Sequence, residues 1–145
     1  MLVSQILKRK GDLVFTTTPA ETVSAVAALL NGRGVGALVV LDAGGQVAGI
    51  VSERDIVRVV AERGAEALDA PVSSCMTRDV HFAEPGETVD ELLGTMTDRR
   101  IRHLPVCHKE RLVGLVSIGD LVKDTIAEQQ FLIEQLERYI NGAPA

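Results

Sequence analysis

An internal repeat is the feature that most restricts how this chain can fold. Residues 49–57 read Gly-Ile-Val-Ser-Glu-Arg-Asp-Ile-Val, and residues 114–122 read Gly-Leu-Val-Ser-Ile-Gly-Asp-Leu-Val. Each copy has the apolar end of a strand, then a Ser-x-x-Asp segment, then the start of an apolar helix face. Two copies of one local pattern predict a duplicated folding unit with two equivalent sites.

The repeat extends beyond these segments in a consistent register. The pairs at an offset of 66 residues are Pro19 with Pro85, Glu21 with Glu87, Thr22 with Thr88, Val23 with Val89, Arg33 with Arg99, Leu38 with Leu104 and Val40 with Val106. After the loss of one residue in a turn, Gly49, Val51, Ser52 and Asp55 match Gly114, Val116, Ser117 and Asp120 at an offset of 65. Both halves are therefore expected to be α/β (α+β) units with the order β-α-β-β-α.

The repeat also divides the chain. We expect a first repeat with an N-terminal helix at residues 1–68, a connector at 69–79, a second repeat at 80–125 and a helical extension at 126–145. The length of 145 residues and the 46% hydrophobic content suit one compact module with a real core.

Local propensities place the elements of the first half. β-branched and aromatic residues predict a strand at 13–17. The segment 18–21, Thr-Pro-Ala-Glu, is a capping pattern that predicts the start of a helix. A buried strand at 35–41 and a return strand at 46–51 follow, joined by a tight turn. The helix that starts at Ser52 should run to about residue 64.

Both ends of the chain have amphipathic patterns outside the repeat. Residues 1–11 predict a short docking helix whose Lys8-Arg9-Lys10 run we interpret as a solvated helix end rather than a phosphate-binding patch. At the other end the last helix continues past its counterpart, through Ile126, Phe131, Ile133, Leu136, Tyr139 and Ile140. This tail packs either on its own protomer or on a second protomer, and the sequence favours neither.

Composition argues against several partners and sites. A net charge of −5 gives no general attraction to nucleic acid or to an anionic membrane. No run approaches the about 20 apolar residues of a membrane span, so we expect a soluble cytoplasmic protein with neither kind of partner. Cys75, Cys107 and the three histidines lack zinc-ligand spacing, so no metal site is expected.

Three sets of motifs together resemble a tandem pair of CBS domains, the cystathionine-β-synthase-type regulatory unit called a Bateman module. The motifs are Thr18-Pro19-x-Glu-Thr-Val with Glu84-Pro85-Gly-Glu-Thr-Val, then Arg102-His103-Leu104-Pro105-Val106, then the two Gly-x-x-Ser-x-x-Asp segments. The resemblance covers about residues 1 to 125. It implies two three-stranded sheets with their helices, related by a pseudo-twofold axis, with a cleft on either side of that axis.

The resemblance also implies ligands and partners. Members of the family bind AMP, ADP, ATP, S-adenosylmethionine or NAD(H), and two such pairs commonly dimerise into a flat disc. Many members are appended to enzymes or transporters, whereas this chain looks like a stand-alone sensor. We therefore expect a homodimer that signals to a downstream protein.

The Ser-x-x-Asp segments have two interpretations. From the residues alone they are helix caps, in which the serine accepts from a backbone amide and the aspartate reaches back to the cap. With the resemblance, the better interpretation is that Asp55 and Asp120 bind ribose hydroxyls while Ser52 and Ser117 face phosphate oxygens.

The two expected sites are not equal. Where the first copy has Arg54, a candidate phosphate clamp or an exposed surface cation, the second has the open backbone of Gly119. The small pair Gly36-Ala37 leaves room for a ligand, and its counterpart is Arg102-His103. We assign Arg102 and His103 to phosphate contact, the alternative being a solvated loop.

Adenine needs a flat apolar slot, which the low aromatic content of 3% makes aliphatic. The candidates for this slot are two strand starts, with Thr17 and Thr18 in one and His81 and Phe82 in the other, and the walls Ala37, Leu104 and Pro105. Phe82 is more often a core residue than a stacking partner.

The predicted function is a regulatory adenine-nucleotide-binding module without catalysis. A ligand-independent dimeric scaffold is the alternative. A nucleotide-processing enzyme is less favoured, since Cys107, near His103 and His108, occupies a strand position matched by Leu41.

Overall fold

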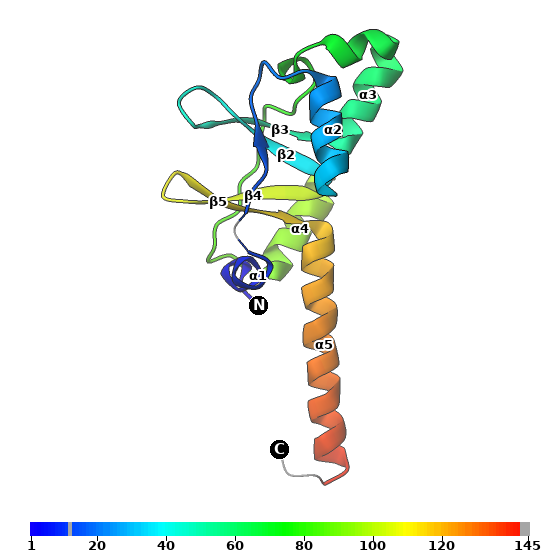
Figure 1. Cartoon of the computed structure of the whole chain (residues 1–145). Coiled ribbons are helices and arrows are strands. Elements are labelled where there is room, and N and C mark those ends of the chain that lie inside the picture. Colours follow the sequence, from blue (N-terminus) through cyan, green and yellow to red (C-terminus); the bar gives the residue numbers. More distant parts are fainter. Residues whose placement is uncertain (12, 143–145) are drawn as a thin grey trace.

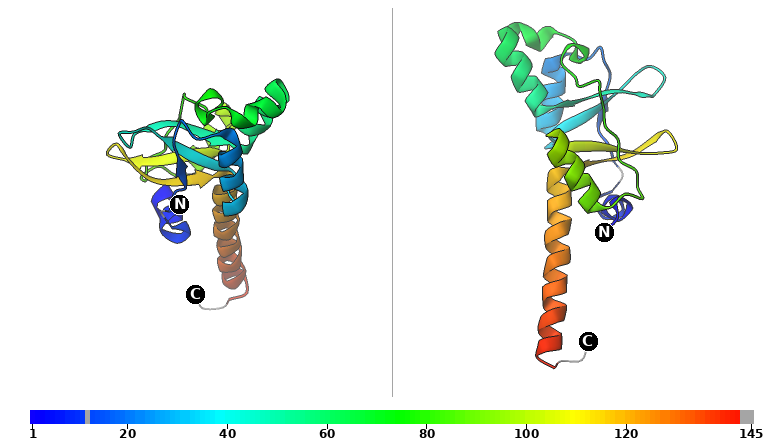
Figure 2. Two further views of the ribbon diagram at one scale, coloured as in Figure 1. Left: turned by 45° about the horizontal axis from the view of Figure 1, so that its top comes forward. Right: turned by 180° about the vertical axis from the view of Figure 1, so that it is seen from behind.

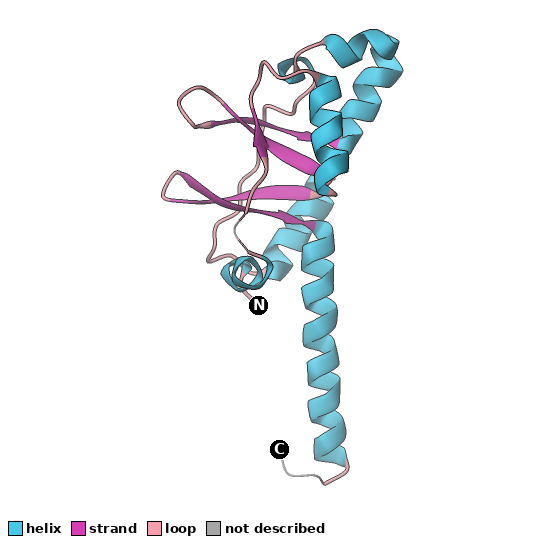
Figure 3. Ribbon diagram, viewed as in Figure 1, coloured by secondary structure: helices cyan, strands magenta, loops and turns pink. Residues whose placement is uncertain are grey.

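The computed structural model describes residues 1–11 and 13–142. Its core is a pair of β-hairpins that lie one above the other, with the helices that follow them on one side (Figure 1). Figure 3 shows that a single long helix projects from this body. No helix among the described residues combines the length and apolar character that a bilayer crossing needs.

The first half has the expected order. β1 (Thr16–Thr17) pairs in parallel with β2 (Ala37–Leu41), which pairs antiparallel with β3 (Val47–Ser52). α2 (Val23–Arg33) connects β1 to β2, and α3 (Glu53–Arg63) follows β3 directly. The apolar faces of these helices and strands form one buried core.

The second half repeats the arrangement with one strand reduced. α4 (Val89–Arg99) precedes the antiparallel hairpin of β4 (His103–His108) and β5 (Arg111–Ser117), and α5 (Ile118–Ile140) follows. The third strand that the resemblance implied is a single bridging residue, Ala83, which pairs in parallel with β4. The duplicated architecture is confirmed, but the sheets have three and two strands.

The segment before each repeat packs against the other repeat. α1 (Val3–Lys10) buries its apolar face in the core of the second half. The segment between α3 and α4, which contains the short helices η1 (Gly64–Asp69) and η2 (Val72–Ser74) and the connector, contributes to the core of the first half. The two halves are therefore held together by an exchange of flanking segments as well as by their sheets.

Glycines in β3 and β5 allow the flanking segments to pass close to these strands. A Cβ on Gly49 in β3 would lie 2.7 Å from the carbonyl oxygen of Thr77 in the connector. A Cβ on Gly114 in β5 would lie 2.5 Å from Cδ2 of Leu7 in α1. Glycine within a strand often marks such a close approach.

Gly49→Ala is expected to lower the free energy of unfolding by about 1–3 kcal/mol, since the clashing atom belongs to the backbone and cannot rotate away. Urea denaturation checks this prediction. Gly94→Ala in α4 is the control, because no atom lies within 4 Å of its added Cβ. The control should gain about 0.5–1 kcal/mol, and equal effects of the two substitutions would contradict the packing described here.

Two predictions for the first half were wrong in their boundaries. The strand expected at 13–17 is limited to β1, and the helix expected within 18–21 begins at Val23. Residues 18–21 form a turn instead, and the cap is Thr22, whose Oγ1 accepts from the amide of Ala25 at 3.1 Å. The Val23 amide donates a hydrogen bond to the carbonyl of Ala70. This contact with a residue distant in sequence fixes where α2 begins.

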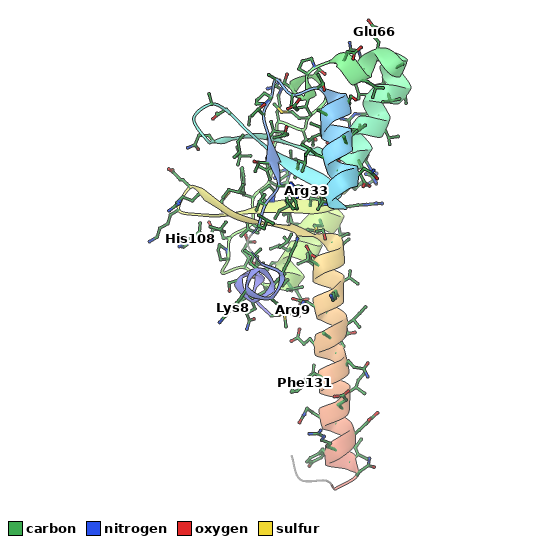
Figure 4. The ribbon with its side chains drawn as sticks, viewed as in Figure 1. Lys8, Arg9, Arg33, Glu66, His108 and Phe131 are labelled. Carbon is green, nitrogen blue, oxygen red and sulfur yellow. The ribbon has the colours of Figure 1, made fainter. Side chains whose placement is uncertain are left out.

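The interpretation of the basic run as a solvated helix end was also wrong for two of its residues. Arg9 forms an ion pair with the buried Asp124 of α5, and Lys10 forms another with Asp120. Figure 4 shows Arg9 on α1 beside the start of α5.

The tail of α5 does not pack on the body of its own protomer. Its large apolar side chains, including Ile126, Phe131, Leu136 and Tyr139, are exposed. Contact with a second protomer remains a prediction.

Candidate functional site

A cleft of about 300 Å³ opens between the two halves. The first half contributes the end of β3 and the start of α3, and the second contributes the segment that enters β4. The lining residues are Gly36, Ile50, Ser52, Glu53, Arg54, Asp55, Arg58, Thr77, Arg100, Ile101, Arg102 and His103. Because both repeats supply walls, anything bound here contacts both.

Asp55 sits at the floor of the cleft and is 4% exposed. Its Oδ2 accepts hydrogen bonds from the Ser52 amide at 2.9 Å and from Ser52 Oγ at 3.1 Å, so the capping interpretation is confirmed. Its Oδ1 accepts from Arg58 Nη2 at 2.8 Å and, more weakly, from Thr77 Oγ1 at 3.4 Å. A buried carboxylate therefore lies at the positive end of a helix, with one oxygen held by the cap.

Cations dominate the remainder of the lining. Arg54 and Arg58 come from α3, and Arg100 and Arg102 come from the segment between α4 and β4. Glu53 is the second carboxylate of the cleft. Four guanidinium groups against two carboxylates favour an anionic ligand.

Arg100 has a strained backbone. It is the cap that ends α4, with φ 55° and ψ 42°, a left-handed conformation that costs a non-glycine residue about 1 kcal/mol. In the first half the equivalent position is Gly34, with φ 65° and ψ 33°. The second repeat thus has an arginine at a position where the first repeat has glycine, which adopts this conformation without strain.

His103 fills the space that Gly36 leaves. A Cβ on Gly36 would lie 3.1 Å from Nε2 of His103, so the small residue admits the imidazole of the other repeat rather than a ligand. Burial and the nearby Lys10 lower the pKa of His103, while Asp120 and Glu53 oppose this. His103 is therefore mostly neutral at pH 7.

The second Ser-x-x-Asp is built in the same way, but a lysine covers its aspartate. Asp120 accepts from the Ser117 amide at 2.8 Å and from Nζ of Lys10 at 2.6 Å. Lys10 also donates to the carbonyl of Leu115 at 2.7 Å. Burial alone would raise the pKa of Asp120, but the hydrogen bonds and charge of Lys10, with Ser117, hold it below its usual range.

The structure brings together only part of the predicted site. Gly36, Ser52, Arg54, Asp55, Arg102 and His103 line the cleft, whereas Ser117, Gly119 and Asp120 do not belong to this lining.

The predicted adenine slot is not assembled around this cleft. Ala37, Leu104 and Pro105 are buried within strands, Thr17 is buried in β1, and Thr18 is exposed on the turn that follows it. His81 and Phe82 line a neighbouring groove, together with Asp79, Thr95, Asp98, Arg99 and the residues Thr77 and Ile101 that it shares with the cleft. Phe82 is 47% exposed, so the preference for a core role was wrong.

Six lining residues were missed from the sequence: Ile50, Glu53, Arg58, Thr77, Arg100 and Ile101. Arg58 lies one helical turn after Asp55 and could have been found from that spacing. Thr77 could not, because its place depends on how the connector crosses β3.

Cys107 is half-buried, and burial raises the pKa of its thiol, which disfavours the reactive thiolate. Among residues 1–11 and 13–142, no group of three or more His, Cys, Asp or Glu side chains is arranged to hold a metal ion.

Comparison with known proteins agrees with the fold. The family model described as "CBS domain" matches residues 6–62 and 72–125. A crystal structure of a CBS-domain-containing protein from Agrobacterium tumefaciens is 43% identical, with a TM-score of 0.83 over 84% of this chain and 91% of that one.

Two similar structures contain adenosine compounds. A CBS domain protein from Pyrobaculum aerophilum complexed with AMP is 28% identical, with a TM-score of 0.74 over 83% of this chain and 89% of that one. The CBS domain pair of protein MJ0100, in complex with 5′-methylthioadenosine and S-adenosyl-L-methionine, is 25% identical, with a TM-score of 0.79 over 88% and 98%. The matched repeats and the shared fold establish that this chain belongs to the CBS domain family, as a tandem pair.

Proposed function

We propose that the protein is a cytoplasmic regulatory module, without catalysis of its own, that binds an adenosine-containing nucleotide in this cleft and signals the occupied state to another protein. The observation that carries the proposal is the set of four arginines and His103 around the buried carboxylate of Asp55. Guanidinium groups bind phosphate, and a carboxylate accepts from the two hydroxyls of a ribose.

Each part of a nucleotide has a partner in the cleft. The phosphate would lie between Arg54 and Arg102, one from each repeat, at the positive end of the α3 dipole. A ribose hydroxyl would take the place of Thr77 Oγ1, which donates only a long hydrogen bond to Oδ1 of Asp55. The adenine would rest on Ile50 and Ile101, in place of the buried walls expected from the sequence.

The charge of the lining ranks the ligands. AMP, ADP, ATP and NAD(H) carry phosphate groups that the arginines can neutralise. S-adenosylmethionine carries a positive sulfonium that gains nothing from them, although a neighbour's complex shows that the fold accepts it. We therefore rank the phosphorylated ligands first.

The cleft also supplies a mechanism for signalling. In the free protein the arginines of the two repeats repel one another across the cleft. A shared phosphate would neutralise them and draw the repeats together, changing a surface that a partner protein reads. The neighbouring site would bind more weakly, because Lys10 already neutralises Asp120.

A thermal-shift panel of AMP, ADP, ATP, NAD, NADH and S-adenosylmethionine tests the function, with adenosine as the control without phosphate. A phosphorylated ligand at 100 times its Kd should stabilise the fold by about 2.7 kcal/mol. Adenosine should shift the melting temperature less than AMP. No shift with any compound would remove the nucleotide-binding function and favour the ligand-independent scaffold.

The affinity for AMP is expected to rise as the pH falls from 8 to 6. The free protein favours neutral His103, whereas a bound phosphate favours the imidazolium, so binding takes up a proton. The phosphate itself titrates near pH 6, and the measured quantity is therefore the difference in pH dependence between wild type and His103→Gln. For each unit that the pH falls, the affinity of the wild type for AMP should rise by up to about tenfold more than that of His103→Gln. Parallel pH dependences of the two proteins would exclude His103 from phosphate contact.

A further inference from the structure

Glu53 places a negative charge in a cleft whose other features favour an anion. It is the first residue of α3 and lines the cleft, and it takes part in no ion pair among residues 1–11 and 13–142. The other carboxylate of the lining, Asp55, is instead neutralised by Arg58. Glu53 therefore presents an unneutralised charge to whatever binds in the cleft.

The fold does not require an acid at this position. An acidic residue in the first turn interacts favourably with the helix dipole, which is the structural role open to Glu53. However, the equivalent first residue of α5 is Ile118, and α5 begins with the same kind of capping box as α3. The carboxylate of Glu53 is thus a feature of this one cleft and not of the repeat.

Glu53 lies where cations from both repeats meet. Seen from behind, the start of α3 and the end of α4 lie close together beside the two hairpins (Figure 2). Arg54 follows Glu53 in α3, and Arg100 and Arg102 come from the segment after α4. Burial lowers the pKa of His103, and the charge of Glu53 opposes this shift, so Glu53 acts on the imidazole that we expect to contact phosphate.

The charge of the lining suits a single phosphate group. Once the ion pair of Arg58 with Asp55 is set aside, three arginines face Glu53, and His103 is mostly neutral. The free cleft therefore has a net charge of +2. A phosphate monoester carries about −1.5 to −2 at pH 7, and each further phosphate of ADP or ATP adds one more negative charge. A monophosphate balances the lining, whereas a triphosphate exceeds it.

The size of the cleft favours the same ligands. Its volume of about 300 Å³ is at the lower limit of the roughly 300–1,000 Å³ that is usual for small-molecule sites. A nucleoside with one phosphate already occupies the apolar wall, the buried carboxylate and the arginines. Charge and volume thus agree on a short phosphate chain.

We propose that Glu53 is a specificity-determining residue that makes the cleft prefer nucleoside monophosphates to di- and triphosphates. This inference rests on the proposed function, because it concerns which nucleotide the same cleft accepts. The repulsion between Glu53 and a ligand grows with the charge of the ligand, so it costs AMP least and ATP most. Glu53 therefore contributes a ratio of affinities and not a gain in affinity for any one ligand.

Calorimetric titration of wild type and Glu53→Gln with AMP, ADP and ATP tests this inference. Glutamine removes the charge and keeps the shape of the side chain. Low salt limits screening, and pH 8 without magnesium keeps the phosphates fully ionised. The wild type should bind AMP more tightly than ATP. Glu53→Gln should raise the affinity for ATP about tenfold, that for ADP less, and that for AMP by no more than about threefold.

Two further variants separate this role from a general effect of charge. Glu62→Gln removes an exposed carboxylate of the same helix outside the cleft, and it should leave the ratio of the AMP and ATP affinities within about twofold of wild type. Glu53→Asp keeps the charge and should retain the preference for AMP.

The outcomes distinguish this inference from the proposed function. A wild type that prefers ATP would overturn the role of Glu53 while nucleotide binding stands. So would equal changes of all three affinities in Glu53→Gln, which are the result expected if Glu53 only stabilises the start of α3. Absence of binding by all three nucleotides to every protein would instead remove the proposed function, and this inference with it.

Discussion

Asp55→Asn is expected to weaken AMP binding by about 10- to 150-fold, whereas Asp120→Asn leaves it within about twofold of wild type. Hydrogen bonds to a charged group contribute about 1.5–3 kcal/mol, which sets this range. Both aspartates close a capping box, but only Asp55 lines the cleft, and Lys10 covers Asp120. Calorimetric titration measures the affinities.

The pair of variants separates a ligand role from a structural one. Each substitution removes the charged partner of a cation, Arg58 for Asp55 and Lys10 for Asp120, so both should lower the free energy of unfolding by about 1–3 kcal/mol. Equal losses of affinity would show that the effect comes from stability, and loss of affinity only in Asp120→Asn would place the nucleotide in the other site.

Arg100→Gly is expected to stabilise the protein while it weakens nucleotide binding. Glycine relieves the left-handed strain at the end of α4, a gain of about 1 kcal/mol in the free energy of unfolding. The same change removes a guanidinium from the cleft, which should raise the Kd for AMP about tenfold or more. Urea denaturation and titration of one protein sample measure both effects.

Arg99→Ala is the matched control for the loss of one positive charge. Arg99 is the neighbouring residue, lies outside the cleft and has a helical backbone, so neither the gain in stability nor the tenfold loss of affinity is expected. If Arg100→Gly binds AMP as tightly as wild type, the Arg100 side chain does not contribute to nucleotide binding.

The repeat made most of the architecture predictable. A helix start at Ser52 and Ser117, a hairpin before each, and the long last helix follow from local patterns that the structure reproduces. Local patterns do not encode which half a flanking segment packs on. That choice places α1 on the second repeat and brings Lys10 to Asp120.

The candidate site was predictable to the same extent. Ser52 and Asp55 act together within one repeat, so the sequence pattern identified both. The contact of Gly36 with His103 joins the two repeats, and the strain at Arg100 depends on how α4 ends. The strand glycines Gly49 and Gly114 were the available signal for the crossing segments, because glycine in a strand marks close backbone approach.

Calorimetric titration of wild-type protein with AMP at low salt tests the central proposal most directly. The account predicts saturable, tight binding of one nucleotide per chain, in the cleft at Asp55, and a weaker second site whose affinity rises when Lys10→Ala uncovers Asp120. Two equal sites in the wild type would contradict the role of Lys10, and no binding of AMP, ADP, ATP or NAD(H) would contradict the proposed function.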